Sequence, residues 1–517
     1  MIDLVGNRTL RDLLEERVAR HPEKSYLVFE AKNGHVQEWT YREILTEVDR
    51  LASGLTELGL VKGDKITVHL ANSPEFVITL FAAATIGAIV VPSNINNRSS
   101  ELRHIASYSD SVAVITEPAF RSIVDDAVTD LPTVQHRLMA RSAENHQGWQ
   151  LWSDVQNSGR GQASSAATSE DVVEMLFTSG TTAQPKGVLL TQANLLRSGE
   201  RSSRSMYLDA DERCLTALPV FHVNAQSLTM LASLTVGGTC ILLEEYRASK
   251  FWDQVRRHKA TQISVVAMLA RTLLAQPPRV SDREHGVRRV FYALNITDRE
   301  REEFETRFGV ELVNGYGLSE AMTVVTIAPV FGPKRWPSIG LPAYDRLVRV
   351  VDSEGNDVPP GTPGELIVHG IPGRTLMKGY YKDPEATERA IRDNWLYTGD
   401  NAIVDEAGYF YFFDRKKDVI KRAGENISAS EVETVLAEHP QIVEAAVIGV
   451  LDPIRDEAVK AFVVVEAGSG LTEEAIREYC AEHLAHFKIP TIIELRDALP
   501  KTSIGKIEKK LLRREIV

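Results

Sequence analysis

The stretch at residues 177–188, which reads Phe-Thr-Ser-Gly-Thr-Thr-Ala-Gln-Pro-Lys-Gly-Val, is the most informative part of the chain. It places four hydroxyl side chains, two glycines and one lysine in a single short loop. An apolar run at 172–177 precedes the loop, and Val188, Leu189 and Leu190 resume the pattern behind it. Short apolar runs bounded by turn residues are typical of buried strands. We therefore predict a loop held between two strands of an α/β protein.

The residue types of this loop favour phosphate binding. Gly180 and Gly187 permit backbone angles and close approaches that other residues do not. Hydroxyl groups supply hydrogen-bond donors, and Lys186 supplies a mobile point charge for polyphosphate. The loop is not a Walker A motif, because in that motif Gly-Lys is followed by Ser or Thr, whereas Pro185 precedes Lys186 here. A solvated loop rich in Ser, Thr and Gly is the alternative.

The composition is that of a soluble enzyme. A length of 517 residues is enough for about three to four domains, or for a large α/β core followed by a smaller module. Lys and Arg number 59 against 71 Asp and Glu, which gives a net charge of -12. Such an excess of negative charge argues against a general affinity for nucleic acid or anionic lipid. The sequence indicates no oligomeric state.

The sequence favours a cytoplasmic location. Cys214, Cys240 and Cys480 lack the spacing of a zinc site or a disulfide framework. The N-terminus has no signal-peptide pattern, and the final Arg-Glu-Ile-Val is no peroxisomal signal. The longest uncharged stretch, 76–91, is short for a membrane span. We predict a buried helix there that runs into a buried strand.

Helices and strands alternate along the first part of the chain. Thr40 and Glu43 form a capping-box pattern at the start of a predicted helix. Residues 157–169, rich in Ser, Gly and Ala, are expected to form an exposed linker. Strands are predicted at 66–70, 112–115, 215–218, 240–243, 262–266 and 289–292, with helix-length segments such as 250–258 between them. This βαβ rhythm indicates an α/β fold with parallel sheets.

A second boundary is predicted near Asp414. Upstream of it, 365–369 and 409–413 have the pattern of strands in a β-rich subdomain. Residues 414–418 form a charged run, for which a solvated turn is the simple alternative.

Beyond this run the pattern of elements restarts. Ser430 and Glu433 form a second capping-box pattern, and strands and a helix follow at 443–450, 459–465 and 473–484. About a hundred residues with their own core suffice for an independent small domain. We therefore expect an N-terminal domain at 1–413 and a C-terminal domain at 414–517.

Four further segments follow the phosphate loop in a characteristic order. They read Asn-Gly-Tyr-Gly-Leu-Ser-Glu at 314–320, Tyr-Thr-Gly-Asp at 397–400, Asp-Arg-Lys-Lys-Asp-Val-Ile-Lys at 414–421 with Gly424, and Pro-Lys-Thr-Ser-Ile-Gly-Lys at 500–506. Together with the loop they resemble motifs of the adenylate-forming enzymes, the superfamily of acyl-CoA synthetases, firefly luciferases and peptide-synthetase adenylation domains. The resemblance covers essentially the whole chain. It implies a large N-terminal domain of parallel α/β sheets with a β-rich subdomain, joined to a small mobile α+β domain.

The reaction that this resemblance implies joins a carboxylate to the α-phosphate of ATP and then passes the acyl group to CoA, with release of AMP and pyrophosphate. Because the two reactants are anions that repel, cations and dipoles must offset the charge that develops in the transition state. The family pattern places the nucleotide against Thr178, Ser179, Gly180, Thr181, Thr182, Lys186, Asn314, Gly315, Tyr316, Gly317, Ser319, Asp400 and Arg415.

Within that set the resemblance implies distinct contacts. The loop hydroxyls and Lys186 would hold the β- and γ-phosphates, and Ser319 would contact the α-phosphate. Tyr316 would stack on adenine, with Asn314 near its amino edge. Glu320 would ligate Mg²⁺, the hard cation that suits carboxylate and phosphate oxygens.

The remaining assignments concern the ribose and the C-terminal domain. Asp400 would accept from the ribose hydroxyls and Arg415 would donate to them. Lys506 would bridge the acyl carboxylate and the α-phosphate. Lys417 would be the hinge about which the C-terminal domain rotates for the second half-reaction, and Gly424 would let the pantetheine arm of CoA pass close to the backbone.

The chain departs from the family pattern at three places. Ala183 replaces a usual glycine and Ser319 a usual threonine, both small changes. A Gly-Gly-Ala-Pro type segment that lines the acyl pocket is replaced by Phe-Tyr-Ala-Leu-Asn-Ile at 291–296. We expect Tyr292 and the residues that follow it, Leu294 and Asn295, to shorten the acyl site and make it polar.

Segments at 271–278, 291–296, 307–310 and 335–340 resemble the crotonobetaine and carnitine CoA-ligase branch of the family. His222 and the polar residues after it would face the acyl group. Tyr316 and Trp336 are candidate aromatic faces for a quaternary ammonium. Alternatively, His222 gates an acyl tunnel as in fatty-acid-activating relatives, and the enzyme is a medium-chain fatty-acid CoA ligase.

Two other classes of function use the same fold. A stand-alone adenylation domain would transfer its acyl group to the thiol of a carrier protein, and motifs do not distinguish that acceptor from CoA. A catalytically silent binding protein would have lost residues such as Lys506 or Glu320, and both are present. The sequence therefore favours an active acid–thiol ligase.

Overall fold

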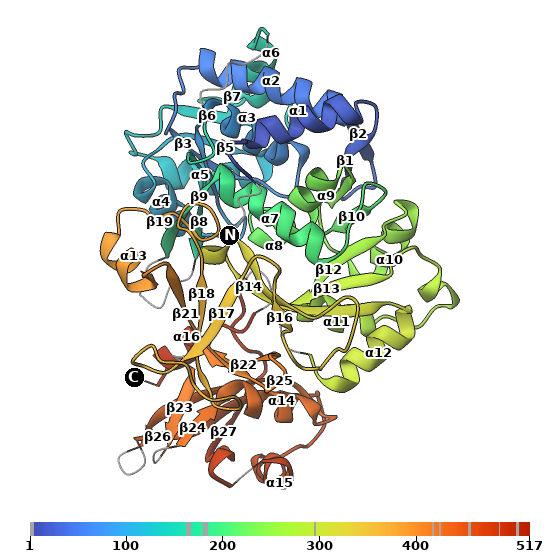
Figure 1. Ribbon diagram of the computed structural model, residues 1–517, viewed down its shortest axis with the longest axis vertical. Helices are drawn as coiled ribbons and strands as arrows, with labels where there is room; N and C mark the ends of the chain where they lie inside the picture. Colours follow the sequence, from blue (N-terminus) through green and yellow to red (C-terminus); the bar gives the residue numbers. More distant parts are fainter. Residues whose placement is uncertain are drawn as a thin grey trace.

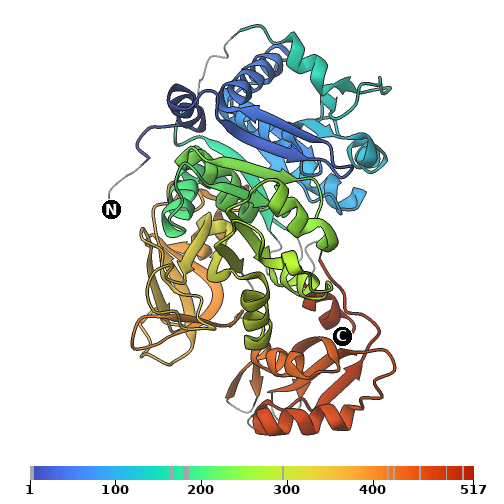
Figure 2. The ribbon, with the colours of Figure 1, turned by 90° about the vertical axis from the view of Figure 1, so that its right-hand side faces the viewer.

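The computed structural model describes residues 5–161, 167–178, 185–293, 296–415, 418–422, 425–452, 456–484, 486–502 and 506–516. Within these ranges the chain forms four β-sheets with helices packed around them (Figure 1). Two large sheets form the upper part of the molecule, a third sheet lies beside them, and the last sheet lies at the foot (Figure 2). No helix in the described ranges is long and apolar enough to cross a membrane.

The first large sheet contains the strands around the predicted phosphate loop. Its eight described strands lie in the order β19-β9-β8-β4-β3-β5-β6-β7. They are β3 (Lys65–His69), β4 (Ile89–Pro92), β5 (Ser111–Thr116), β6 (His136–Met139), β7 (Gln150–Leu151), β8 (Val172–Thr178), β9 (Lys186–Thr191) and β19 (Gly379–Tyr380). Strand β3 pairs in parallel with β4 and β5, whereas β9 pairs antiparallel with β8 and β19.

The second large sheet is parallel in its centre and antiparallel at its edges. Its described strands lie in the order β16-β15-β14-β13-β12-β10-β11-β1-β2. They are β1 (Ser25–Glu30), β2 (Val36–Thr40), β10 (Arg213–Thr216), β11 (Thr239–Leu243), β12 (Gln262–Val266), β13 (Arg289–Ala293), β14 (Glu311–Leu318), β15 (Thr323–Ile327) and β16 (Leu341–Pro342). The parallel pairings from β1 through β14 confirm the predicted α/β class.

Two smaller sheets follow in the chain. The third sheet is antiparallel and contains β17 (Leu347–Val351), β18 (Gly364–His369), β20 (Ile391–Arg392), β21 (Trp395–Val404) and β22 (Phe410–Arg415). The fourth contains β23 (Val419–Arg422), β24 (Glu425–Ser428), β25 (Ile442–Asp452), β26 (Asp456–Val465) and β27 (Ile492–Leu495). The third sheet is the β-rich part that the sequence predicts.

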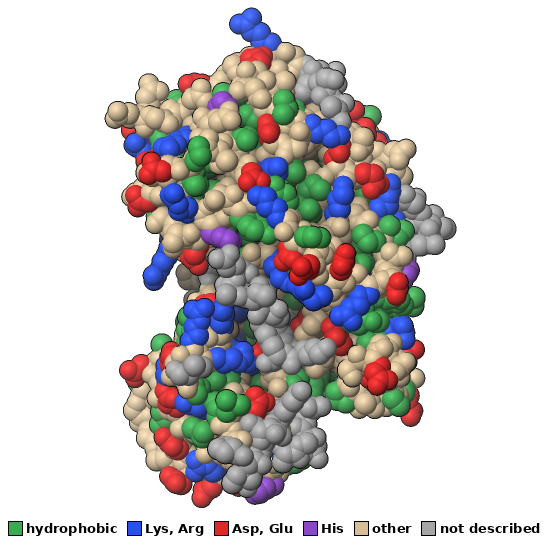
Figure 3. All heavy atoms as spheres, turned by 90° about the vertical axis from the view of Figure 1, so that its left-hand side faces the viewer, with side chains coloured by type: hydrophobic (Ala, Val, Ile, Leu, Met, Phe, Trp, Pro, Cys, Tyr) green, Lys and Arg blue, Asp and Glu red, His purple; other side chains and the backbone are tan. Residues whose placement is uncertain are grey.

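Helices cover the faces of these sheets. They are α1 (Leu10–Arg20), α2 (Tyr41–Glu57), α3 (Pro74–Ile86), α4 (Ser99–Tyr108), α5 (Arg121–Val128), α6 (Trp152–Ser158), α7 (Gln192–Ser205), α8 (Val223–Ala225), α9 (Ala232–Val236), α10 (Ala248–Arg257), α11 (Ala267–Leu274), α12 (Asp298–Phe308), α13 (Pro384–Ala390), α14 (Ala429–Glu438), α15 (Glu473–His483) and α16 (Lys509–Arg514). On the face in Figure 3, basic and acidic side chains are interspersed rather than gathered by sign.

Local signals in the sequence explain how two of these helices begin. The hydroxyl of Thr40 accepts from the backbone N–H of Glu43, whose carboxylate accepts in return from the N–H of Thr40. This confirms the predicted capping box of α2. Helix α3 follows the cap Ser73, ends at Gly87 with φ +76°, and runs into the buried strand β4. The uncharged stretch at 76–91 is therefore a buried helix and strand, as predicted.

The capping box predicted at Ser430 is wrong. Helix α14 begins two residues earlier, after Ser428, whose hydroxyl accepts from the N–H of Glu431. Glu433 has other partners, because its Oε1 accepts from the N–H of Val447 at 2.6 Å and lies 2.8 Å from Nζ of Lys509. The carboxylate of Glu433 therefore forms a tertiary ion pair with Lys509 and takes no part in capping α14.

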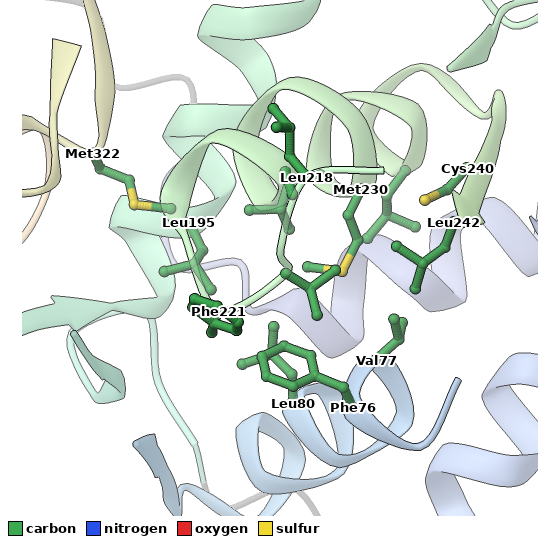
Figure 4. Packing of buried hydrophobic residues seen from close by; sticks show 14 of the residues in the cluster. Phe76, Val77, Leu80, Leu195, Leu218, Phe221, Met230, Cys240, Leu242 and Met322 are labelled. Atoms are coloured by element: carbon green, nitrogen blue, oxygen red, sulfur yellow. The ribbon is translucent and has the colours of Figure 1, made fainter. Parts of the chain in front are cut away.

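Apolar packing joins the two large sheets. Phe76, Val77 and Leu80 of α3 face Phe221 and Met230 in the close view of Figure 4. The fourth sheet is packed by separate clusters of its own, around Val432 and Phe462 among others. The division at residue 413 stays a prediction.

A buried ion pair connects α7 to the loop after β16. Arg201 donates from Nε and Nη2 to the two carboxylate oxygens of Asp345 at 2.6 and 2.8 Å. The two side chains are only 1% and 4% exposed. Burial alone would raise the pKa of Asp345, but the charge and hydrogen bonds of Arg201 lower it below its usual value. Both charges are thus compensated in the core.

We expect Arg201→Leu to lower the free energy of unfolding by about 3–5 kcal/mol, because it leaves the carboxylate of Asp345 buried without its bidentate partner. Arg204→Leu is the matched control on the same helix. Arg204 pairs with Glu200 but is 55% exposed, so its loss should cost less than about 1 kcal/mol. Equal losses in urea-induced unfolding of the two variants would contradict this account.

Candidate functional site

The predicted phosphate loop connects β8 to β9. These strands pair antiparallel, and Thr178 at the end of β8 lies opposite Lys186 at the start of β9. The hairpin therefore confirms that strands flank the loop on both sides. Ser179, Gly180, Thr181 and Thr182 lie outside the described residues.

A second segment brings an aromatic ring to Lys186. Strand β19 adds to the edge of β9, with Tyr380 opposite Val188. The ammonium nitrogen of Lys186 lies 4.8 Å from the centre of the Tyr380 ring. The hydroxyl of Tyr380 donates to Oε1 of Glu320 at 3.0 Å. Lys186, a candidate phosphate ligand, and Glu320, a candidate metal ligand, thus both contact Tyr380.

Glu320 lies in a strained turn that is tied to the core. The turn η4 (Ser319–Ala321) is followed by Met322 and Thr323 with φ of +42° and +71°. Such backbone strain is typical of functional sites. The backbone carbonyls of Ala321 and Met322 accept from Arg346 and Arg201, respectively. Buried arginines therefore hold the turn that presents Glu320.

Tyr316 and Asp400 come together from different sheets. The hydroxyl of Tyr316 donates to Oδ2 of Asp400 at 2.6 Å. Burial, followed by the charges of Asp400 and Glu320, raises the pKa of Tyr316 well above its usual value, so this hydroxyl stays protonated. Because the charge of Glu320 acts on this pKa, Glu320 must lie near Tyr316. Three predicted site residues therefore share one neighbourhood.

The residues beside Tyr316 on β14 are fixed by backbone contacts. Asn314 is buried, and its Nδ2 donates to the carbonyl of Ser338 at 2.9 Å. A Cβ on Gly315 would lie 2.8 Å from the ring of Phe291, and one on Gly317 would lie 2.1 Å from the carbonyl oxygen of Thr323. These two glycines are therefore required by close packing in the protein itself.

Arg415 and Lys506 are the predicted C-terminal site residues within the described ranges. Arg415 lies directly opposite Asp400 in the pairing of β22 with β21. Lys417 and Gly424 lie outside the described residues. Lys506 is exposed, and its backbone N–H donates to the hydroxyl of Thr502 at 3.2 Å.

His222 lies close enough to Lys506 to feel its charge. Burial, followed by the positive charge of Lys506, lowers the pKa of His222 to about 4. The imidazole is therefore neutral at pH 7. Its Nε2 is buried and has no hydrogen-bond partner among the described residues. Phe221, whose ring points into the core in Figure 4, anchors this segment.

Polar contacts hold the segment that carries His222. Asn72 donates to the carbonyl of Leu218 at 3.0 Å and accepts from the N–H of Val220 at 2.9 Å. The hydroxyl of Ser264 lies 2.9 Å from Oδ1 of Asn224. His222, Asn224 and Ser264 are neutral polar side chains, and the positive charge of Lys506 acts on His222.

The expectation that Tyr292 narrows the acyl site is wrong. Tyr292 is fully buried, and its ring packs 6.0 Å from that of Trp336. Burial raises the pKa of the Tyr292 hydroxyl well above its usual value, and the charges of Arg271 on α11 and Glu300 on α12 also act on it. The guanidinium of Arg301 lies 5.4 Å from the centre of the Trp336 ring. Leu294 and Asn295 lie outside the described residues.

Sequence reasoning missed two residues of this region. Tyr380 belongs to a two-residue strand, which leaves no periodic pattern. Glu174 on β8 is fully buried, and its Oε1 accepts from Nε2 of Gln226 at 2.6 Å. Gln226 begins the π-helical turn η2 (Gln226–Leu231), the kind of distortion often found at functional sites. A lone carboxyl inside the apolar run at 172–177 was the available signal for Glu174.

Comparison with known families covers most of the chain. The AMP-binding enzyme family matches residues 14–381, and the AMP-binding enzyme C-terminal domain matches residues 431–506. Curated proteins named crotonobetaine/carnitine–CoA ligase are 39% identical over 517 residues in Salmonella arizonae and 38% identical over 519 residues in Salmonella enteritidis. Each alignment covers 99% of this chain and 100% of the relative. The chain belongs to the AMP-binding enzyme family.

Solved structures agree with this assignment. An anthranilate CoA ligase in complex with anthranoyl-AMP has the same fold, with a TM-score of 0.90 at 24% identity over 99% of this chain and 97% of that one. The o-succinylbenzoate CoA synthetase of Bacillus subtilis in complex with its acyl-adenylate has a TM-score of 0.85 at 25% identity over 98% of each chain. The protein is an AMP-forming acyl-CoA synthetase that acts through an acyl-adenylate.

Glu174 gives the stability of the protein a specific pH dependence. Burial raises its pKa to about 8, although the hydrogen bond from Gln226 opposes the shift. We therefore expect the native state to hold a proton that the unfolded state releases above about pH 5, so the contribution of Glu174 to stability falls as the pH rises from about 5 to 8. Glu174→Gln does not titrate. Relative to the wild type, it should gain about 1.4 kcal/mol per pH unit in that window.

The measurement is the free energy of unfolding in urea between pH 5 and 9. Glu57→Gln, at an exposed position on α2, is the control whose curve should run parallel to that of the wild type. If the Glu174→Gln curve is also parallel, the buried carboxyl does not carry a proton in the native state.

Proposed function

We propose that the chain activates a short or medium-length, polar carboxylic acid with ATP and transfers the acyl group to CoA, with release of AMP and pyrophosphate. The observation that supports this proposal is the buried Nε2 of His222, which has no hydrogen-bond partner among the described residues and lies where the charge of Lys506 acts. An apolar acyl chain would leave this nitrogen unsatisfied, which costs on the order of 1–3 kcal/mol. A polar acid can satisfy it instead.

In this proposal the nucleotide binds across the two large sheets and β21. Lys186 and the loop hydroxyls bind the β- and γ-phosphates, and Ser319 binds the α-phosphate. Tyr316 stacks on adenine beside Asn314. Asp400 and Arg415 bind the ribose hydroxyls. Binding requires Asp400 to exchange its hydrogen bond with Tyr316 for one with the ribose, or to use its second oxygen.

Glu320 is the proposed ligand of Mg²⁺. Its carboxylate is half-buried, is presented by a rigid turn and supplies the hard oxygen that Mg²⁺ prefers. When bound, the ion would offset negative charge on the phosphates. The residues present therefore fit the metal.

Lys506 is proposed to serve adenylation alone. Its charge acts on His222, which would face the acyl group in this proposal. There it would offset the repulsion between the carboxylate and the α-phosphate. For thioester formation we propose that the domain at 414–517 rotates on that at 1–413 about Lys417. The rotation would withdraw Lys506 and bring Gly424 beside CoA.

Substitutions separate the two half-reactions. Lys506→Ala should lower acyl-adenylate formation by about two orders of magnitude or more, as loss of a transition-state charge partner does. It should still convert supplied acyl-adenylate and CoA to product. Lys501→Ala is the matched control in the same segment, because Lys501 pairs with Glu444, and it should retain both activities. Equal loss in both half-reactions of the Lys506 variant would defeat the assignment.

A substitution at the proposed hinge should impair the second half-reaction and not the first. Lys417→Pro locks the φ angle that the rotation must change, so it should spare pyrophosphate release and slow transfer to CoA. A variant that completes both steps at the wild-type rate would mean that the rotation uses another residue.

The identity of the acid is tested by comparing kcat/KM for crotonobetaine, an uncharged branched analogue, hexanoate and palmitate with the same ATP and CoA. We expect the short polar acids to exceed palmitate by tenfold or more, since about 1.4 kcal/mol suffices for a factor of ten. Crotonobetaine is included because the curated relatives are named for it. A preference for palmitate would contradict the proposed polar pocket, and transfer to a carrier-protein thiol but not to CoA would contradict the proposed acceptor.

A further inference from the structure

Tyr380 contacts two proposed nucleotide-binding groups at once. Its hydroxyl donates to Glu320 and its ring lies against the ammonium of Lys186. We propose that Tyr380 is a positioning residue for the ATP–Mg²⁺ complex: its hydroxyl orients the carboxylate of Glu320 and its ring holds Lys186 at the mouth of the phosphate loop. This inference rests on the proposed roles of those two residues.

The backbone leaves Tyr380 little freedom to move. The N–H of Lys378 donates to the carbonyl of Leu189 at 2.8 Å, and the N–H of Tyr381 donates to that of Gly187 at 2.8 Å. The N–H of Tyr380 itself donates to the hydroxyl of Thr387 at 2.9 Å. Three backbone hydrogen bonds to β9 and α13 therefore fix the position of this segment.

The same segment also fixes the backbone of Glu320. The N–H of Met377 donates to the carbonyl of Glu320 at 2.7 Å. Tyr380 then reaches the carboxylate of the same residue. One short segment thus holds Glu320 at both its main chain and its side chain.

The hydroxyl of Tyr380 acts as the donor in its bond with Glu320, because an ionised carboxylate only accepts hydrogen bonds. A hydrogen bond from a phenol to an ionised carboxylate is stronger than one between two neutral groups.

The ring has a separate task. A cation over an aromatic face is attracted without being neutralised. Tyr380 therefore holds Lys186 in place while its full charge stays available to phosphate oxygens. A carboxylate in that position would instead compete with phosphate for the ammonium. One substitution can remove the hydroxyl alone, and another can remove the hydroxyl together with the ring.

Two substitutions at Tyr380 separate these tasks. Tyr380→Phe keeps the ring and removes the hydroxyl, so it should raise the Mg²⁺ concentration for half-maximal pyrophosphate release by about tenfold, as loss of a hydrogen bond to a charged group does. The KM for ATP at saturating Mg²⁺ should change less than about twofold. Tyr380→Leu should raise both values, since it also removes the contact with Lys186.

Tyr381→Phe is the matched control. The neighbouring hydroxyl donates to Asp110 at 2.7 Å, on the far side of this segment, and its loss should change neither value. Circular dichroism and the melting temperature of each variant separate altered positioning from altered folding. A melting temperature unchanged by Tyr380→Phe, together with the tenfold Mg²⁺ shift, supports positioning.

A double mutant makes the test decisive. If Tyr380 acts through Glu320, then Tyr380→Phe should add nothing to the Mg²⁺ shift of Glu320→Gln. Additive shifts, or a wild-type Mg²⁺ response in Tyr380→Phe, would overturn the proposal. A Glu320→Gln enzyme with a normal Mg²⁺ response would instead overturn the proposed metal role of Glu320. A wild-type enzyme that releases no pyrophosphate with any acid would overturn the proposed function itself.

Discussion

The short pairing of β19 with β9 is the constraint on which the candidate site depends. It fastens a segment from the third quarter of the chain to the strand that leaves the phosphate loop. Lys186, Tyr380 and Glu320 meet because of that pairing. The group that lies against the ammonium of Lys186 is the neutral ring of Tyr380 and not a charged side chain. Lys186 and Glu320 are thus organised in the protein before any nucleotide arrives, which lowers the cost of ordering them on binding.

The parts of the fold set by apolar periodicity could be predicted from the sequence. The strand predicted at 262–266 is β12, and the uncharged stretch at 76–91 is a buried helix and strand. The capping box at Thr40 was also readable, because both of its partners lie within one turn. The start of α14 could not be predicted in this way, because the pattern at Ser430 is not a capping box. There Glu433 pairs with Lys509, a residue distant in sequence that only the tertiary fold brings close.

The motifs indicated which residues to consider, whereas the fold decides what those residues contact. Tyr316 and Asp400, for which the resemblance implies separate contacts with adenine and ribose, lie within hydrogen-bonding distance of each other. Tyr292 was misplaced because a strand buried on both faces gives no sign of which side each residue faces. Tyr380 was missed because a two-residue strand has no periodicity, and its importance arises only from what β9 and η4 place beside it.

The central claim is that Lys186, Glu320, Tyr316 and Asp400 act on a single bound nucleotide. A crystal structure of the protein with a non-hydrolysable ATP analogue and Mg²⁺ tests it most directly. We expect Lys186 at the β- and γ-phosphates, Mg²⁺ within coordination distance of Glu320, the ring of Tyr316 on adenine and Asp400 on the ribose. A nucleotide bound elsewhere, or a metal ion without Glu320 among its ligands, would contradict the account.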